Sequence, residues 1–262
     1  MWRLIRRRRC VYPMTYKRIS MMNNSFRPLM IHIEYLIPLL AFWRTITSEI
    51  GKYKHDHTVA NNIVCAIHSF VYILHYNYNY NMDYAIHASI GYYIYDLFYI
   101  FQCIRASSSS SSASSSASSA SSATIHQLQQ RAPYIIHHLI GTYLLYDTLM
   151  SDNTGPLLHA YYLLEASNIM IYVSYHLHKE YRAYKTVISF AEFIQLLWYS
   201  YYRVYMFSSF LYHNQPRFFE FSRMSQCFII ILYTMGVVWT CKLVKRNIGN
   251  LSIFYSNNRN LR

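Results

Sequence analysis

The sequence predicts an all-α fold, a multi-pass transmembrane helical bundle of six or seven helices. Of the 262 residues, 53% are hydrophobic and only 13% are charged, whereas an ordinary soluble domain carries about 25% charged residues. The hydrophobic residues form runs of roughly 20, enough to cross a hydrocarbon layer, and these runs leave almost no polar face. The mean hydropathy is only +0.05, but the 29 tyrosines count as polar although their rings suit membrane interfaces.

The chain is predicted to begin with a basic tail over residues 1–27, which holds eight Arg and Lys residues and no acid. It lacks the apolar central stretch of a signal peptide. Two interpretations stay open: a mitochondrial presequence, or a juxtamembrane patch held by anionic lipid head groups at about 1 kcal/mol per basic residue. We favour the lipid patch.

A first transmembrane helix and its loop are predicted over residues 28–55. Its apolar part, residues 28–43, is interrupted by Glu34 and Pro38, so it crosses the membrane only in the seven-helix alternative. Six clearer spans make up a transmembrane domain over residues 56–245. These spans lie at 59–76, 84–104, 133–150, 156–177, 187–211 and 226–241.

Segments of biased amino-acid composition lie between the predicted spans. Residues 106–123 contain only Ser and Ala, a composition that buries nothing and predicts a disordered linker. Residues 77–84 are rich in Tyr and Asn and predict a short loop between helices. After the last span, residues 246–262 are predicted to form a polar, basic tail. The positive-inside rule does not decide the orientation, because Lys and Arg fall in similar numbers on the two sides of a seven-span arrangement.

Ionisable groups inside the spans are the first candidates for a functional site. Such a group is costly at bilayer depth and normally faces the bundle interior or a wet cavity. Asp96 is the only charge in its span, and Tyr92 lies on the same face one turn earlier. We expect both side chains to point inward.

The paired histidines His137 and His138 lie in a run that is otherwise suited only to burial. Adjacent side chains on a helix project about 100° apart. One imidazole can therefore reach a cavity while the other packs against a neighbouring helix.

Glu165 is the lone charge in the middle of the following span. Tyr161, Asn168 and Tyr172 lie with it along one polar stripe of an apolar helix. An isolated carboxylate there is either protonated or paired. We expect at least one of the paired histidines to meet Glu165, directly or through water.

Three stretches, in this order and spacing, resemble the TLC family of multi-pass membrane proteins, which includes the ceramide synthases and the translocating-chain-associating membrane protein. They are GYYIYD (91–96), IIHHLIGTYLL (135–145) and LLEASNIMIYVSYHL (163–177). The resemblance covers roughly residues 56–245. It implies a membrane-embedded helical domain that handles lipids.

In the ceramide synthases of this family, the paired histidines and two aspartates of the next helix are associated with acyl transfer from acyl-CoA to a sphingoid amine. Here the aspartate positions hold Glu165 and Asn168, so one acid is replaced by an amide. The resemblance implies acyl-CoA as a substrate if the chain is an enzyme, and no resident cofactor. It implies His137, His138 and Glu165 as catalytic residues and Asp96, Asn168, Tyr92, Tyr161 and Tyr172 as substrate-binding residues.

Three functions stay open at this point. The first is lipid binding, transport or membrane lipid homeostasis in an intramembrane cavity. The second is acyl transfer, which needs a base for the amine proton and donors for the thioester oxyanion. The third is a buried polar network that fixes helix packing at about 0.6 kcal/mol per contact. We favour lipid handling, by an integral membrane protein of the endoplasmic reticulum or a related endomembrane, and a homodimer stays open.

We expect no metal site, no disulfide framework and no nucleic acid partner. The net charge of +13 lies in the termini and breaks, so membrane lipids, with anionic head groups at the basic termini, are the expected partners. The remaining histidines lack metal-binding motifs, and the cysteines form no close pair. These residues are His32, His55, His57, His68, His75, His87, His159, His176, His178, Cys10, Cys65, Cys103, Cys227 and Cys241.

Overall fold

The computed structural model describes residues 33–54, 56–78, 80–112, 117–150 and 154–259, and within these residues the fold is all-α, with no strand. The predicted N-terminal tail lies outside the described residues. The helices are α2 (Ile33–Lys54), α3 (His57–Tyr78), α4 (Met82–Ser112), α5 (Ala117–Met150), α6 (Thr154–Glu180), α7 (Lys185–Ser200), the π-helix η1 (Tyr201–Met206), α8 (Phe207–His213), α9 (Gln215–Phe218) and α10 (Arg223–Arg259).

The apolar runs of the sequence located the helices correctly. Each of the six clearer runs falls within a helical segment, and the weaker first run continues into α2. The predicted span at 187–211 corresponds to α7, η1 and α8, which follow one another without a break. These three form one long helix that contains a π-helical turn.

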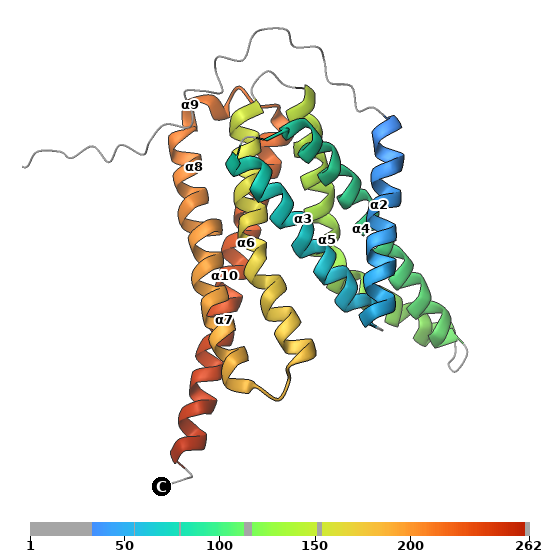
Figure 1. The fold of residues 1–262 in the computed structure, drawn as a ribbon. Helices are drawn as coiled ribbons and strands as arrows, with labels where there is room; N and C mark the ends of the chain where they lie inside the picture. Colours follow the sequence, from blue (N-terminus) through green and yellow to red (C-terminus); the bar gives the residue numbers. More distant parts are fainter. Residues whose placement is uncertain (1–32, 55, 79, 113–116, 151–153, 260–262) are drawn as a thin grey trace, which may run out of the picture.

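The helices pack side by side along one long axis (Figure 1). α2 packs on α3 and α4 at one side of the bundle, and α7, η1 and α10 pack together at the other. α6 lies between them and contacts α3, α5 and α7. Its middle is buried on nearly every face: Leu157, Ala160, Leu163, Leu164 and Ser167 each expose 1% or less. α6 is therefore the central helix, and the polar groups that it carries are shielded.

Polar side chains define the starts of α3 and α4. Asp56 Oδ1 accepts hydrogen bonds from the backbone N–H groups of Thr58 at 2.7 Å and Val59 at 3.2 Å, which otherwise lack partners at a helix start. Burial raises the pKa of the Asp56 carboxyl, but these hydrogen bonds outweigh it and hold the pKa below its usual value. Asn81 has a left-handed φ of 40° and caps α4. The connection between α3 and α4 is shorter than the predicted loop at 77–84, because α3 continues to Tyr78 and α4 begins at Met82.

The Ser/Ala segment at 106–123, predicted to be a disordered linker, has helical backbone over residues 106–112 and 117–123. α4 continues through Ser112 and α5 begins at Ala117, so helical backbone covers the segment except for residues 113–116, which are not described. Alanine is the best helix former, and extending an existing helix is far easier than nucleating a new one. The two packed helices therefore propagate into the segment from both sides.

The C-terminal tail predicted over residues 246–262 is also helical as far as Arg259, because α10 continues past its apolar span. The same ease of helix extension explains this difference. Residues 260–262 lie outside the described part of the chain.

Two of the described helices are long and apolar enough to cross a membrane: Thr58–Tyr78 within α3 and Arg223–Gly249 within α10. Of the other predicted spans, the one at 187–211 is divided between α7, η1 and α8, and α7 by itself has only 16 residues. Length and composition thus identify two candidate spans, and the other predicted spans stay predictions.

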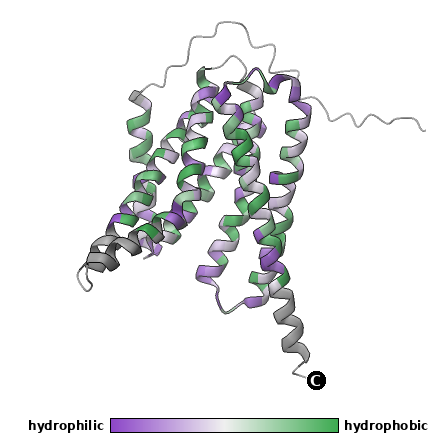
Figure 2. Ribbon diagram, turned by 180° about the vertical axis from the view of Figure 1, so that it is seen from behind, coloured by the Kyte–Doolittle hydropathy of each residue, from purple (hydrophilic) through white to green (hydrophobic). Residues whose placement is uncertain are grey.

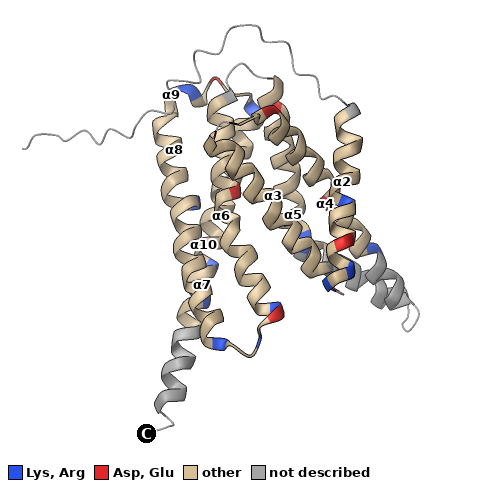
Figure 3. Ribbon diagram, viewed as in Figure 1, with Lys and Arg blue, Asp and Glu red and all other residues tan. Residues whose placement is uncertain are grey.

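Hydrophobic residues recur along the helices (Figure 2), and many large ones are exposed, whereas Lys, Arg, Asp and Glu lie mainly toward the two ends of the bundle (Figure 3). Only 17% of the most apolar window of α10 is buried against the protein. An apolar surface of this extent marks contact with a membrane or with another protein. Large exposed apolar side chains on α7 and α10 include Phe190, Phe193, Leu197, Ile230, Ile231 and Val238.

Candidate functional site

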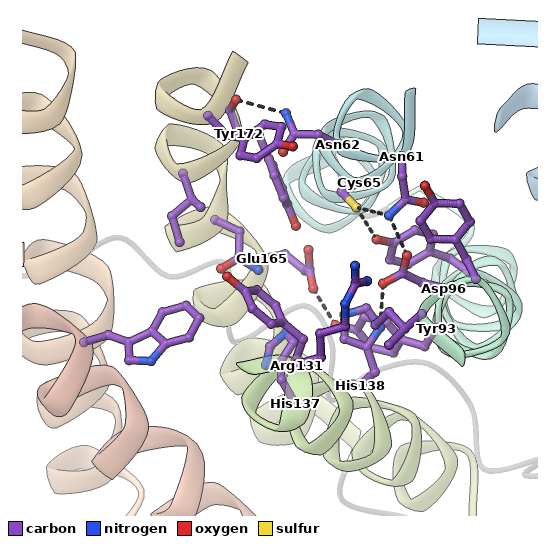
Figure 4. Close-up of a pocket in the computed structure, with 18 of the residues that line it drawn as sticks. Asn61, Asn62, Cys65, Tyr93, Asp96, Arg131, His137, His138, Glu165 and Tyr172 are labelled. Carbon is purple, nitrogen blue, oxygen red and sulfur yellow. Dashed lines mark hydrogen bonds and ion pairs between the residues drawn. The ribbon is translucent and has the colours of Figure 1, made fainter. Parts of the chain in front are cut away.

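A cavity of about 320 Å³ lies between α3, α4, α5, α6, α7, η1 and α10 (Figure 4). This volume is within the range of small-molecule sites. The residues predicted from the sequence converge on it, although they come from three different helices. The predicted residues that line the cavity are Tyr92, Asp96, His137, His138, Glu165, Asn168 and Tyr172.

The Glu165 carboxylate is held where α6 meets α3 and α4. The residue is 1% exposed. Its Oε1 accepts a hydrogen bond from the Tyr93 hydroxyl at 2.5 Å, and its Oε2 accepts one from the Ser69 hydroxyl. His68 Nδ1 lies 3.7 Å from Oε2. Groups from two other helices thus surround this acid and hold it in one position.

A second acid, Asp96, faces the cavity from α4 and is 4% exposed. Its Oδ1 accepts a hydrogen bond from Asn61 Nδ2 at 2.8 Å, and its Oδ2 lies 3.3 Å from His138 Nδ1. The contact with His138 is at ion-pair distance but lacks hydrogen-bond geometry. His138 Nδ1 therefore has no hydrogen-bond partner among the described residues, and neither does Asn61 Oδ1. Buried polar atoms normally have one, so these two atoms can bond a water or a ligand.

The pairing of acids and histidines differs from the prediction. We expected His137 or His138 to meet Glu165, but His138 lies beside Asp96, and the imidazole at ion-pair distance from Glu165 is His68. The reason is helix packing: α5 packs most extensively on α4, and α6 on α3. Each imidazole therefore meets the acid of the helix against which its own helix packs.

Both adjacent histidines reach the cavity, although the sequence indicated that one can reach it while the other packs. His138 is buried and His137 is half-buried, and their ring centres are 5.5 Å apart. The cavity extends along α5 as far as Arg131 and Tyr134. A cavity that follows α5 in this way can receive two side chains that project at different angles.

Gly141 allows Tyr93 to lie directly against α5. A Cβ atom at position 141 would lie 2.4 Å from Cε2 of the Tyr93 ring. That ring packs 4.8 Å from the imidazole of His138, and its hydroxyl binds Glu165. The close approach of α4 and α5 thus places the tyrosine that holds the acid.

Stacked rings form part of the cavity wall: Tyr92 lines the cavity, and His68, 3.7 Å from Glu165, stacks on it. The His68 and Tyr92 rings are parallel, with centres 4.0 Å apart. His68 Nε2 lies 2.9 Å from the Ser89 hydroxyl, and the Tyr92 hydroxyl donates to Cys65 Sγ at 2.7 Å. These contacts hold the two rings in place, so the wall is a fixed part of the site.

Tyr161 is the exception among the predicted residues, because it does not line the cavity. It is 1% exposed and packs edge-on against Tyr72, with ring centres 4.5 Å apart. It lies one helical turn before Glu165, within the hydrophobic core. The polar stripe of α6 therefore lines the cavity at Glu165, Asn168 and Tyr172 but not at Tyr161.

Several residues of the site were missed by the sequence analysis. On α3, Asn61, Cys65, His68 and Ser69 recur at helical spacing and form a polar face that could have been recognised. On η1, Arg203 is a basic residue inside an apolar run, and the argument that selected Asp96 and Glu165 applies equally to it. Arg203 is 4% exposed and lines the cavity.

The arrangement can bind a partly polar molecule and can move a proton. An imidazole beside a carboxylate is a common general base, and the cavity holds such a pair in His138 and Asp96. Within the described residues, no three His, Cys, Asp or Glu side chains are grouped to hold a metal ion. Within the described residues, the fold and site define an all-α bundle with a cavity between its helices that holds buried acids, histidines and an arginine. No protein-family model, curated protein or solved structure matches the chain.

Proposed function

We propose that this chain is a multi-pass membrane protein of the TLC family whose central cavity binds a lipid. The observation that carries the proposal is a cavity with a few convergent polar groups inside a bundle that exposes many large hydrophobic side chains. In this proposal the six longer helical segments, and α2 in a seven-span arrangement, cross the membrane. The expected location is the endoplasmic reticulum or a related endomembrane, with anionic lipid head groups at the basic termini.

The surface supports a membrane setting. Exposed apolar side chains on α7 and α10 are costly in water but not in hydrocarbon. The acids and bases that interrupt the apolar segments mostly face inward: Asp96, Glu165 and Arg203 each expose 4% or less. This is the distribution expected when the surroundings are apolar and the polar groups satisfy one another inside.

The cavity suits an amphiphile. Its polar groups come from α3 to α6 and η1, whereas the side chains that α10 contributes are the large and mainly apolar Leu232, Met235 and Trp239. A few convergent polar groups in a mainly apolar pocket fix the orientation of a ligand whose larger part is hydrophobic. A lipid with its head group at the acids and arginines meets that description.

A second candidate function is acyl transfer from acyl-CoA to a lipid amine, which the contact between His138 and Asp96 favours. The amine nitrogen attacks the thioester carbonyl carbon while His138, oriented by Asp96, takes the amine proton. The new C–N bond forms as the C–S bond breaks, and the thiolate of coenzyme A leaves and takes up a proton. In this scheme Glu165 positions Tyr93 rather than acting as the base, because both of its oxygens already accept hydrogen bonds.

Membrane integration is tested by extraction. Membranes that contain the protein, treated with alkaline carbonate, are expected to retain it in the pellet, because spanning helices resist extraction. Release of the protein into the supernatant, together with a known peripheral protein as the control, would show that the helices do not span the bilayer.

Lipid binding is tested by mass spectrometry of protein purified in mild detergent. We expect a retained lipid, and a several-fold loss of it in Met235→Trp, because the larger ring fills the cavity. The matched control is Val238→Trp on the outer face of α10, where the side chain is 47% exposed; this variant is expected to keep the lipid. Equal retention in both variants would contradict a lipid in this cavity.

A product that forms from acyl-CoA and a sphingoid amine, and disappears in His138→Ala, would establish the second candidate.

A further inference from the structure

Within the lipid cavity proposed above, on which this inference rests, we propose that Arg203 and Arg131 bind the phosphate group of a phosphorylated lipid. Both arginines line the cavity. They come from different elements, η1 and α5, and both face the same cavity. The inference concerns the class of head group, which the lipid proposal by itself leaves open.

Arg203 is a buried cation, and among the described residues only neutral groups bond to it. Its Nε donates a hydrogen bond to the Ser167 hydroxyl at 2.7 Å, and its Nη2 lies 3.5 Å from Asn168 Oδ1. The guanidinium carbon lies 5.6 Å from the centre of the Tyr199 ring. A guanidinium has five N–H donors and stays charged in proteins. Arg203 therefore keeps donors and a full positive charge for a further partner.

The backbone around Arg203 places its side chain at the cavity. η1 is a π-helical turn in the long helix that runs from α7 to α8, and such turns are frequent at functional sites. Gly236 of α10 makes room for the aliphatic part of the side chain, since a Cβ at that position would lie 3.2 Å from Arg203 Cβ. The guanidinium is thus fixed at the cavity wall before any ligand binds.

The acids of the cavity do not neutralise the arginines. Asp96 bonds Asn61 and faces His138, and Glu165 is held by two hydroxyl groups. Among the described residues, neither arginine forms an ion pair with a carboxylate. Buried charges in proteins are normally paired, so an anionic ligand is the partner that fits.

Arg131 supplies a second cation. It extends from α5 into the cavity (Figure 4) and is half-buried. A planar guanidinium matches the oxygens of phosphate or carboxylate with two parallel hydrogen bonds. A terminal phosphate offers three acceptor oxygens and a carboxylate only two, so two arginines on different elements favour phosphate.

The test uses the full chain in detergent micelles and compares three probes by calorimetric titration. These are phosphatidic acid, diacylglycerol with the same acyl chains, and inorganic phosphate. We expect phosphatidic acid to bind about tenfold more tightly than diacylglycerol or better, as charge-assisted hydrogen bonds to the head group require. Inorganic phosphate is expected to compete only weakly, because it lacks the acyl chains.

The variants Arg203→Gln and Arg131→Gln are each expected to lose most of this preference. If Arg203→Gln fails to fold, Arg131→Gln still tests the inference. Arg131 forms no hydrogen bond with another described side chain, so its replacement is expected to leave the fold intact. The matched control is Lys185→Gln, which removes an exposed charge at the start of the same long helix and is expected to keep the preference.

The possible outcomes separate this inference from the lipid proposal. Equal binding of phosphatidic acid and diacylglycerol would overturn the phosphate site and leave the lipid cavity standing. A fatty acid is titrated as a further probe, and tighter binding of it than of phosphatidic acid would assign the arginines to a carboxylate and overturn the inference. Binding of inorganic phosphate as tight as that of phosphatidic acid, without any binding of diacylglycerol, would support the phosphate site but contradict a lipid ligand. If none of the probes binds, both proposals fail.

Discussion

Replacing Glu165 with alanine is expected to lower the free energy of unfolding by about 3 kcal/mol or more. The substitution leaves the buried hydroxyl groups of Tyr93 and Ser69 without their acceptor, and each unsatisfied buried group costs about 1–3 kcal/mol. It also opens a cavity in the most buried part of α6. Thermal unfolding of the purified protein in micelles measures the effect as a fall in Tm.

Two further variants show which property of Glu165 matters. Glu165→Gln keeps the shape and one acceptor oxygen, and hydroxyl groups can accept from its amide, so a smaller loss of stability is expected. The control is Glu180→Ala at the exposed end of the same helix, where the carboxylate lies 3.7 Å from Lys54 Nζ. A surface pair of this kind contributes about 0–1 kcal/mol. A fall in Tm for Glu165→Ala no larger than for Glu180→Ala would contradict the role of Glu165 in organising the site.

Replacing Gly141 with alanine is expected to destabilise the protein by about 1–3 kcal/mol, as overpacking in a core does. The direction of the change in stability is informative, because replacing glycine with alanine within a helix otherwise raises the free energy of unfolding by about 1 kcal/mol. The new Cβ would collide with the Tyr93 ring at 2.4 Å. That ring cannot turn away freely, since Glu165 holds its hydroxyl and His138 packs against its face.

The matched control is Gly249→Ala on α10, where an added Cβ has nothing within 4 Å and stability is expected to stay equal or rise. A double-mutant cycle with Tyr93→Phe adds a second check. Without its hydroxyl the ring is no longer tethered to Glu165, so Gly141→Ala is expected to cost less in that background. If Gly141→Ala raises Tm as Gly249→Ala does, the close contact between α4 and α5 does not constrain Tyr93.

The helices were predictable because the cost of exposing apolar groups acts on local stretches of chain. Each run of about 20 apolar residues needs burial or a membrane whatever its neighbours are, so the runs at 59–76 and 226–241 mark α3 and α10 directly. For the Ser/Ala segment, composition predicted a linker, because composition does not report how far a packed helix propagates beyond its apolar part. Helical backbone through Ser112 and from Ala117 is decided by the packed helices on either side.

The members of the site were partly predictable for a similar reason. An isolated charge in an apolar helix is expensive in hydrocarbon, and this cost alone indicated that Asp96 and Glu165 face inward, where both are buried. The same cost applies to Arg203, which shows that the sequence signal was present there also. The sequence therefore contains the list of polar groups that must meet inside the bundle.

The partners within that list were decided by the tertiary structure. His138 lies beside Asp96, and His68 beside Glu165, because α5 packs on α4 and α6 on α3. Burial is costly for any polar group that lacks a partner, whichever residue could be that partner. The cost therefore requires each buried polar group to be paired, but it does not decide which residue pairs with it. The choice depends on helix contacts such as the one at Gly141, where the absence of a side chain lets Tyr93 approach α5 and reach Glu165. The sequence by itself determined which groups need partners, and the packing of the helices determined which partners they have.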